Sequence, residues 1–393
     1  GVSFLFGDDL KFDLDENTNE RTPDEEWLDE VWRANDKMAT LYELGMNGAV
    51  AGHAFLKIVL DPAEEYPRLV VLDPTNVTAF SDPHDVGRVI RYRIQYPITG
   101  ADGRQKTFRQ TIRREGNVWT ILEEEAPLDG ADFRPIGPPI TWPYPFAPIV
   151  DCQNLVRPNL FWGLADLEED VLGLNRALNF ILSNNQRINK HFGDPQTIAK
   201  GVELKDIKRA VGSIWTIPGG TKDNPTDVFN LEMQSDGAFS MEQYKRVKES
   251  LHETAEVPEV ATGKMESTGQ LSGVALAILY GPMVKRTGRK RFTYGGLFVE
   301  TNRRLLIIGK RDGTQRSEIH WPEIVPGDRV AEGQALLQDQ EMGASKDTLL
   351  QKRGYDPEKE REKRELEADE LIPNPMQGLT QPVGGKQAGE DEE

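Results

Sequence analysis

Apolar positions along the chain switch between two spacings, and the switches divide the sequence into helical and extended regions. Apolar residues at every third or fourth position mark one face of a helix, whereas strict alternation marks a half-buried strand. The helical spacing recurs over residues 22–48, 164–192, 240–257 and 274–308. Alternation is clearest from Ile90 to Tyr96. The pattern predicts an α+β protein with an extended region between helices.

The first long helix has an explicit start signal. Thr22 is suited to cap it, Pro23 to occupy its first position, and Asp24 and Glu25 to place negative charge in its first turn. Apolar residues continue at helical spacing from Trp27 onward. We therefore expect one helix that runs to about residue 48.

Residues 53–122 predict an antiparallel meander. Asp102-Gly103 and Gly116-Asn117 are turn sequences between alternating segments, so consecutive strands should pair through tight turns. Six prolines follow between Pro135 and Pro148. Because proline cannot donate a backbone hydrogen bond, this density favours an extended crossing segment.

Two long helices flank a compact insertion at residues 195–238. Each helix has an apolar stripe typical of a core or an interface. The stripes are Leu167, Val171, Leu174, Leu178 and Ile181, then Tyr244, Val247, Leu251 and Ala255. Ser240 and Gln243 predict a capping box for the second helix, which Val257-Pro258 should end. The insertion predicts short strands at residues 196–199, 214–217 and 228–231 and a helix at residues 204–211.

A polar loop, residues 259–273, joins the second stripe helix to the next one. Glycine, serine and threonine surround a single lysine, Lys264. Loops held by rigid elements often carry function, and a plain surface connection is the alternative. The helix that follows, residues 274–308, has expected kinks at Gly281-Pro282 and Gly295-Gly296. Its middle holds five cations within seven residues: Lys285, Arg286, Arg289, Lys290 and Arg291.

The C-terminal part predicts short elements and then a tail. Residues 318–321 read as a strand and residues 322–326 as a link. Helices are expected over residues 329–340, 346–353 and 358–371, the second with Ser345 as its cap. Beyond Pro373 the chain is rich in glycine, proline and acid, a composition that predicts disorder.

Composition limits the classes of function. A net charge of -18 argues against a protein that coats nucleic acid, which needs a basic face, but it permits a duplex inside a channel with few cations. The single cysteine, Cys152, excludes an internal disulfide framework. No apolar run approaches the roughly 20 residues that span a bilayer. Because the chain begins with Gly1, we expect that a leading segment precedes it.

No catalytic or metal-binding motif is complete. Asp13, Asp15 and Asn17 have calcium-loop spacing, but Thr18 replaces the turn glycine, so a solvated acidic loop is favoured. His252 begins a sequence like that of a zinc helix, which lacks the second histidine. Gly263-Lys264-Met265 lacks the remaining residues of a phosphate loop. We predict no enzymatic activity, no metal and no cofactor.

Several pieces in order resemble the portal proteins of tailed bacteriophages, in the siphovirus group with a long wing insertion. The resemblance spans most of the chain, and its order carries more weight than any one piece. The pieces are Phe4-Leu5-Phe6-Gly7, residues 45–60, the helix of residues 163–192, Ser272-Gly273-Val274-Ala275-Leu276, and residues 321–328.

The resemblance implies a portal fold with named parts. Residues 1–163 would form a wing of one helix and an antiparallel meander, and residues 164–192 and 240–257 two stem helices. Residues 193–239 would form a small α/β clip, residues 258–273 a tunnel loop, and residues 274–328 the long wing helix with a return strand. Residues 329–372 would be a helical crown and residues 373–393 a disordered acidic tail.

The resemblance also implies a function in the virion. A ring of about twelve subunits at one capsid vertex would be the channel through which double-stranded DNA is packaged and ejected, without regard to sequence. Its partners would be the terminase large subunit, a head-completion or adaptor protein, and the major capsid and scaffolding proteins. It would involve no membrane and be assembled in the host cytoplasm.

Three groups of residues are the candidate sites. The tunnel loop would face DNA through Lys264, Glu266, Ser267, Thr268 and Gln270. Lys245, Lys248 and His252 could face the channel from the stem. The five-cation cluster would pair with acids of a neighbouring subunit, the favoured interpretation, or contact DNA. The alternatives for the whole chain are another ring-forming head-tail connector component and an enzyme with an unrecognised site.

Overall fold

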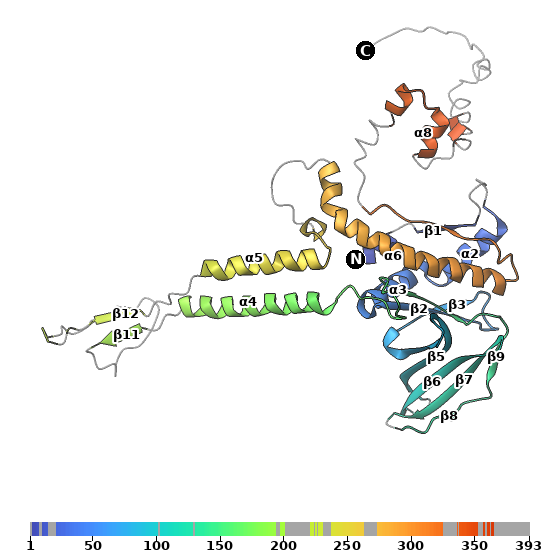
Figure 1. The fold of residues 1–393 in the computed structure, drawn as a ribbon, viewed down its shortest axis with the longest axis horizontal. Coiled ribbons are helices and arrows are strands. Elements are labelled where there is room, and N and C mark those ends of the chain that lie inside the picture. The colour runs from blue at the N-terminus through green and yellow to red at the C-terminus, as the bar shows by residue number, and fades with distance from the viewer. Residues whose placement is uncertain are drawn as a thin grey trace, which may run out of the picture. The chain divides into compact units, whose positions relative to one another are not determined.

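The fold is known from a computed structural model, which describes residues 2–7, 10–14, 21–100, 103–128, 130–193, 197–200, 221–223, 225, 227–230, 237–262, 273–324, 336, 338–352, 357, 360–361 and 363–364. The chain divides into two compact units, Gly1–Val325 and Pro326–Glu393. The first unit contains helices and antiparallel sheets (Figure 1), which confirms the predicted α+β class.

The helices of the first unit are α1 (Val2–Phe6), α2 (Pro23–Ala34), α3 (Lys37–Ala51), α4 (Glu169–Gly193), α5 (Gly237–Thr254) and α6 (Gly273–Ile308). The strands before α4 are β1 (Lys11–Asp13), β2 (His53–Val59), β3 (Arg68–Leu72), β4 (Val77–Asp82), β5 (Asp85–Thr99), β6 (Gln105–Glu115), β7 (Val118–Pro127), β8 (Arg134–Pro135), β9 (Ile140–Trp142) and β10 (Ile149–Gln153). After α4 come β11 (Thr197–Lys200), β12 (Asp227–Asn230) and β13 (Glu318–His320).

The predicted start of α2 is confirmed, but its predicted length is wrong. The Thr22 side chain accepts from the backbone N–H of Glu25, whose side chain accepts in return from the Thr22 backbone, a complete capping box. The helix ends at Ala34, and Asp36 takes a left-handed conformation with φ of 48° before α3 begins. Asn35 donates to Pro67 O and accepts from the Leu69 backbone, which ties the break to β3.

Two antiparallel sheets are stacked on the helices. Strands β4 to β8 form the meander that the turn sequences predicted, with β9 also paired to β7. Its predicted start at residue 53 is wrong, because β2 and β3 pair with β10 instead. A separate sheet, β10-β2-β3, lies between this meander and the helical layer. Strand β2 is buried on both sides, since Leu56 and Ile58 join the helical core while Phe55 joins the core under the meander. The proline-rich segment is extended only in part: β9 within it pairs with β7, as does β8 at its start, but bends interrupt it at residues 136–138 and 143–146.

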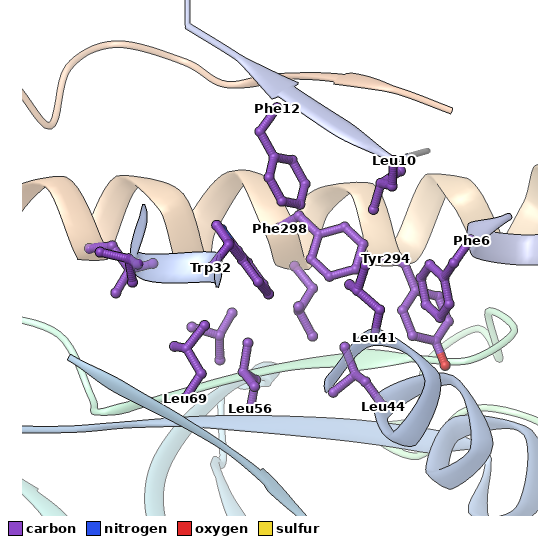
Figure 2. Packing of buried hydrophobic residues seen from close by; sticks show 14 of the residues in the cluster. Phe6, Leu10, Phe12, Trp32, Leu41, Leu44, Leu56, Leu69, Tyr294 and Phe298 are labelled. Atoms are coloured by element: carbon purple, nitrogen blue, oxygen red, sulfur yellow. The ribbon is translucent and has the colours of Figure 1, made fainter. Parts of the chain in front are cut away.

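Helix α6 organises the larger core (Figure 2). Phe298 is fully buried, and its ring lies 5.7 Å from that of Phe12 and 6.0 Å from that of Trp32. The Trp32 indole N–H donates to Asn302 Oδ1 at 2.9 Å, so the polar atom inside this core has a partner. Gly48 of α3 lets the helices approach, because a Cβ there would lie 1.9 Å from the Tyr294 hydroxyl oxygen.

Helix α6 matches its predicted range, and its first turns run in a different direction from the rest (Figure 1). Pro282 lies inside it. Proline removes a helical hydrogen bond, so the predicted kink at Gly281-Pro282 has its usual cause. Strand β13 also occurs where it was predicted, and it pairs with β1 from the other end of the unit.

Helices α4 and α5 pack side by side (Figure 1). Val171, Leu178 and Ile181 of the predicted stripe are buried in this hairpin.

The predicted starts of both helices are wrong. Residues 164–168 are not helical, because Leu164 forms a bridge with Leu155 and the Asp166 backbone donates to Ala49 O. Helix α5 begins at Gly237, so Ser240 does not cap it and its hydroxyl instead contacts Asn185 of α4.

Of the insertion between α4 and α5, the structure describes the pair of β11 with β12, which confirms two of its predicted strands. The predicted strand 214–217 and helix 204–211 lie outside the described residues.

In the second unit, α8 (Lys346–Lys352) follows Ser345, whose hydroxyl accepts from the Thr348 backbone at 3.2 Å. This confirms the predicted cap. The tail from residue 373 lies outside the described residues.

Candidate functional site

The candidate site is the junction where the segment that leads into α4, the end of α5 and the middle of α6 meet. The predicted DNA-facing residues Lys264, Glu266, Ser267, Thr268 and Gln270 lie outside the described residues. The structure describes both flanks: a 3₁₀ helix, Glu259–Thr262, before them and α6 after them. The contacts of these two flanks therefore fix where the loop begins and ends.

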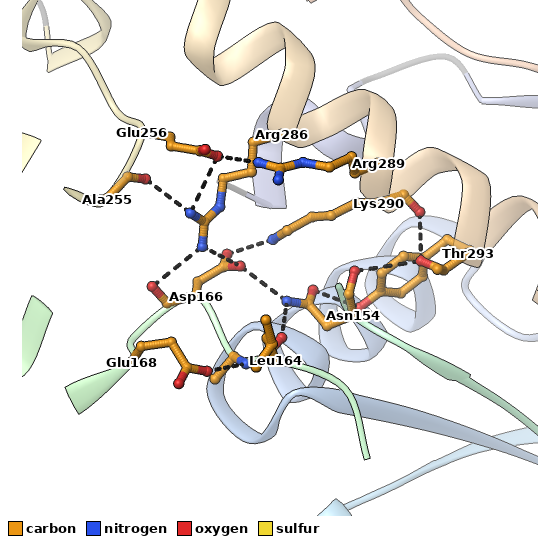
Figure 3. A network of polar contacts seen from close by, with 12 residues as sticks. Asn154, Leu164, Asp166, Glu168, Ala255, Glu256, Arg286, Arg289, Lys290 and Thr293 are labelled. Atoms are coloured by element: carbon orange, nitrogen blue, oxygen red, sulfur yellow. Dashed lines mark hydrogen bonds and ion pairs between the residues drawn. The ribbon is translucent and has the colours of Figure 1, made fainter. Parts of the chain in front are cut away.

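Asp166 is the centre of this junction (Figure 3). It lies in the segment that leads into α4, and its carboxylate contacts Lys290 Nζ at 2.5 Å and Arg286 Nη2 at 3.3 Å. The side chain of Lys290 is 4% exposed. A buried cation requires a charged partner, because removing it from water costs more than a hydrogen bond returns. Asp166 thus fixes the entrance of α4 to the middle of α6.

Asn154 connects the same carboxylate to the core. It is fully buried, and its amide group donates to Asp166 Oδ1 and to Leu164 O, both at 3.0 Å. Its side-chain oxygen accepts from the Tyr294 hydroxyl at 3.3 Å. The junction is therefore continuous with the rigid core that contains Phe298.

The exit of α5 is held by the same stretch of α6. Arg286 donates to Ala255 O at 3.3 Å and lies 3.6 Å from the Glu256 carboxylate, which Arg289 also contacts. Glu256 itself has a φ of 53°, an uncommon conformation for a residue other than glycine. Both ends of the α4–α5 hairpin are thus fastened to one turn of α6.

The charges of the junction shift its pKa values. Burial by itself raises the pKa of the Asp166 carboxyl, but Lys290, Asn154 and Arg286 outweigh burial, so the net shift is downward. Burial lowers the pKa of Lys290, and Asp166 opposes part of that shift. Asp166 has three stabilising partners, so it is ionised at neutral pH.

The near flank of the loop is tied to α5. Glu259 forms an ion pair with Lys248 and lies 3.5 Å from His252 Nε2, and His252 Nδ1 also lies 2.8 Å from Val257 O. On the α6 side, the Tyr280 hydroxyl donates to Val260 O at 3.5 Å. Two of the three predicted channel-facing residues therefore hold the base of the loop, while Lys245 is exposed on α5.

The five-cation cluster has mainly internal partners. Arg286, Arg289 and Lys290 pair with Asp166 and Glu256. Arg291 donates to Pro322 O at 2.6 Å and to Phe4 O at 3.3 Å, and Lys285 is exposed. The predicted partners were acids of a neighbouring subunit or DNA. Partners within the same chain were not predicted, because Asp166 and Glu256 have no local relation to the cluster.

A second polar cluster went unnoticed in the sequence. His53 Nε2 lies 2.9 Å from one oxygen of Asp151, and the Tyr92 hydroxyl donates to the other at 2.6 Å. His53 is 1% exposed and stacks on Phe161. Burial raises the pKa of the neighbouring Cys152 thiol, which disfavours a reactive thiolate. This geometry suits a link between strands better than nucleophilic chemistry.

Within the described ranges, no three or more His, Cys, Asp or Glu side chains are grouped to hold a metal ion. Of the three residues with calcium-loop spacing, Asp13 lies in β1 and contacts His320, and the others lie outside the described residues. None of the described helices is both long enough and apolar enough to cross a bilayer.

Comparisons with solved structures identify the fold. A chain in the neck of a native gene transfer agent (GTA) particle, computed with C12 symmetry, has a TM-score of 0.52 and 14% identity, covering 91% of this chain and 89% of that one. The two chains share a fold.

Two further solved chains come from the same kind of particle. One in the neck of an empty GTA particle, computed with C6 symmetry, has a TM-score of 0.49 and 13% identity, over 91% of this chain and 87% of that one. One in the native virion has a TM-score of 0.47 and 13% identity, over 84% of each chain. No protein-family model matches the sequence, and no curated protein matches it.

Proposed function

We propose that this protein is a portal subunit: about twelve copies form a ring at one vertex of a virion, and double-stranded DNA passes through its centre during packaging and ejection. The observation that carries the proposal is the shared fold, over 91% of this chain, with a neck chain from a particle computed with C12 symmetry. The order of sequence pieces that resembles portal proteins supports it independently.

In a portal subunit, each part of this fold would correspond to a named portal domain. The α4–α5 hairpin is the stem, and the insertion that contains β11 and β12 is the clip, which meets the terminase large subunit and afterwards a head-completion protein. The meander and α6 form the wing, and the second unit forms the crown. The major capsid and scaffolding proteins surround the assembled ring, and no enzymatic activity or cofactor is part of this role.

The tunnel loop, residues 258–273, is the proposed contact with DNA. Its flanks are fastened to α5 through Glu259 and to α6 through Tyr280, so the intervening residues have a rigid base. Passage of any genome requires contacts that are weak and independent of sequence, and backbone phosphates offer the same charge at every step. Lys264 suits this task, because its flexible ammonium group lacks the fork that grips a phosphate bidentately.

The ring is tested by mass and by shape. Purified protein, without nucleotide, should sediment as an assembly of about twelve copies, and negative-stain images should show an end-on ring with a central channel. Another ring-forming head-tail connector component would also give such an assembly. Binding of a terminase large subunit would distinguish a portal from that component. A species of only one to four copies would favour an enzyme and contradict the portal proposal.

Lys264→Glu tests the DNA contact. Assembly should be unaffected, and the amount of DNA packaged per capsid should fall, because like charges would then face the phosphates. Lys264→Arg is the matched control, and it should keep packaging, since it keeps the positive charge. If Lys264→Glu capsids package and retain DNA as the unaltered protein does, Lys264 has no part in translocation.

A further inference from the structure

Helix α3 carries an exposed apolar ridge. Four large side chains lie at four-residue spacing along one face, with exposures of 42% for Met38, 55% for Tyr42, 41% for Met46 and 63% for Val50. The ridge spans 12 residues, or roughly 18 Å at the rise of an α-helix. The opposite face of α3, which includes Leu41 and Leu44, is buried in the core.

Exposure of these four apolar side chains is unusual, because α3 has few charged residues that would keep it in contact with water. Over its 15 residues α3 has two charged side chains, Lys37 and Glu43. The Lys37 ammonium group lies 4.6 Å from the centre of the Phe12 ring, so it is turned toward the core. A helix face as apolar as this ridge is normally covered, because monomeric proteins seldom expose a continuous apolar patch.

Charge favours a second copy of this chain as the cover. Each copy has a net charge of -18, so copies repel one another unless they meet through surfaces that are nearly neutral. The ridge is close to such a surface, since its four side chains are uncharged and Glu43 is the one exposed charged residue of α3 beside them. An acidic segment, such as residues 390–393 of the tail, would be a poor cover because its carboxylates would lose their hydration.

A groove beside α6 offers a second surface. Its volume is about 1450 Å³, and its lining combines Phe292, Gly295, Gly296 and Val299 of α6 with charged side chains, among them Arg88, Asp151, Glu300 and Arg316. Phe292 is 81% exposed. Exposed aromatic and apolar residues beside polar and charged side chains are a usual composition of a protein interface.

The two glycines strengthen this interpretation. A glycine inside a helix is less favourable than alanine, so its presence usually has a packing reason. A Cβ at Gly296 would meet no atom of this chain within 4 Å, and one at Gly295 would make only ordinary contacts. Packing within one copy therefore does not require glycine at either position, whereas close approach by another helix would favour it.

We infer that the α3 ridge of one copy packs into the α6 groove of the next. The inference rests on the proposed ring, because a closed ring of identical copies requires two different surfaces that fit each other. The ridge and the groove share no residue, so every copy can use both at once.

The test uses two variants of the full chain. Met46→Glu with Val50→Glu alters the ridge, and Phe292→Glu alters the groove. All three side chains are exposed, so each variant should keep the circular dichroism spectrum of the unaltered protein. Each variant alone should assemble at least roughly tenfold more weakly in sedimentation, as is usual when a central interface residue is lost. Leu128→Glu, which alters a side chain with 42% exposure in a turn after β7, is the matched control and should assemble normally.

Mixing the two variants tests the pairing itself. Each retains one intact surface, so an equimolar mixture should form a 1:1 dimer and nothing larger. Gly296→Ala is an independent test: it should raise the melting temperature, through better helix propensity, while it weakens assembly.

Normal assembly of the ridge variant would overturn the inference, and so would a mixture that stays monomeric. An unaltered protein that is monomeric at every concentration would also overturn it. If the unaltered protein forms only short open oligomers while the mixture still gives the 1:1 dimer, the inference stands and the proposed ring fails.

Discussion

The core around Phe298 and the α4–α5 hairpin are built from similar residues, yet their burial differs sharply. Phe298 and Trp32 are 0% exposed, whereas Phe180 of α4 and Phe239 of α5 are 68% and 70% exposed. The inner face of α6 is covered by α1, α2, α3 and the β10-β2-β3 sheet. The hairpin has two helices that cover only each other's inner faces.

The two regions are therefore held in place by different interactions. The core is complete within one copy, so its stability comes from apolar burial and close packing. The hairpin has little burial of its own, and it is fastened to the core through Asp166 and Glu256. In the proposed ring, neighbouring hairpins would cover the aromatic side chains that one copy leaves exposed.

The largest expected effect comes from the core. Phe298→Ala should lower the free energy of unfolding by about 3–5 kcal/mol, because it leaves a cavity among Phe12, Trp32 and Phe6. The measurement is urea denaturation of unassembled protein. Phe180→Ala is the matched control in the hairpin and should change stability by less than about 0.5 kcal/mol. Equal losses from the two substitutions would remove the distinction between these regions.

A smaller effect is expected at the attachment of the hairpin. Asp166→Ala leaves Lys290 buried without its carboxylate, and breaking a buried pair in this way costs about 3 kcal/mol. Hydrogen exchange should show the loss concentrated in the first turns of α4 and the middle of α6. Glu169→Gln, which breaks the exposed pair with Arg176, should cost no more than about 1 kcal/mol. An unchanged stability in Asp166→Ala would mean that the junction does not hold the hairpin.

The smallest effect is the pH dependence of this attachment. The folded-state pKa of Asp166 is below its ordinary value, so its stabilising contribution is present above a pH of about 4 and is lost as the pH falls through the folded pKa. The free energy of unfolding should therefore decrease on acidification. In Asp166→Asn this part of the decrease should be missing, and the difference between the two pH profiles is the measurement. Parallel profiles would contradict the assigned shift.

The structure changes the interpretation of the predicted stripe on α4. The sequence predicted that the stripe, which includes Val171 and Leu174, lies in a core or an interface. Val171 is buried within the hairpin of a single copy, so replacing it with Asp would disturb α4 against α5 before it affected assembly. Periodicity showed that the stripe is covered, but it carries no information on whether the covering helix belongs to the same chain.

Local chemistry determined a large part of the fold. The capping box at Thr22, the range of α6 and the order of meander strands were all predictable, because caps, apolar periods and turn residues act within a few positions. The same signals failed at Asn35, where the side chain bonds across to the loop before β3. A contact between residues that are distant in sequence overrode the continuous helical pattern.

Tertiary structure alone decided which charges meet. The sequence shows five cations on α6 but not that Asp166, 124 positions before Lys290, pairs with Lys290 and Arg286. Likewise nothing in residues 11–13 predicts pairing with residues 318–320. Local preferences arise from a residue's own backbone and its near neighbours, whereas these pairs depend on the folded path of the whole unit. Burial then fixes them, because a charge or backbone group removed from water must take the partner that the fold provides.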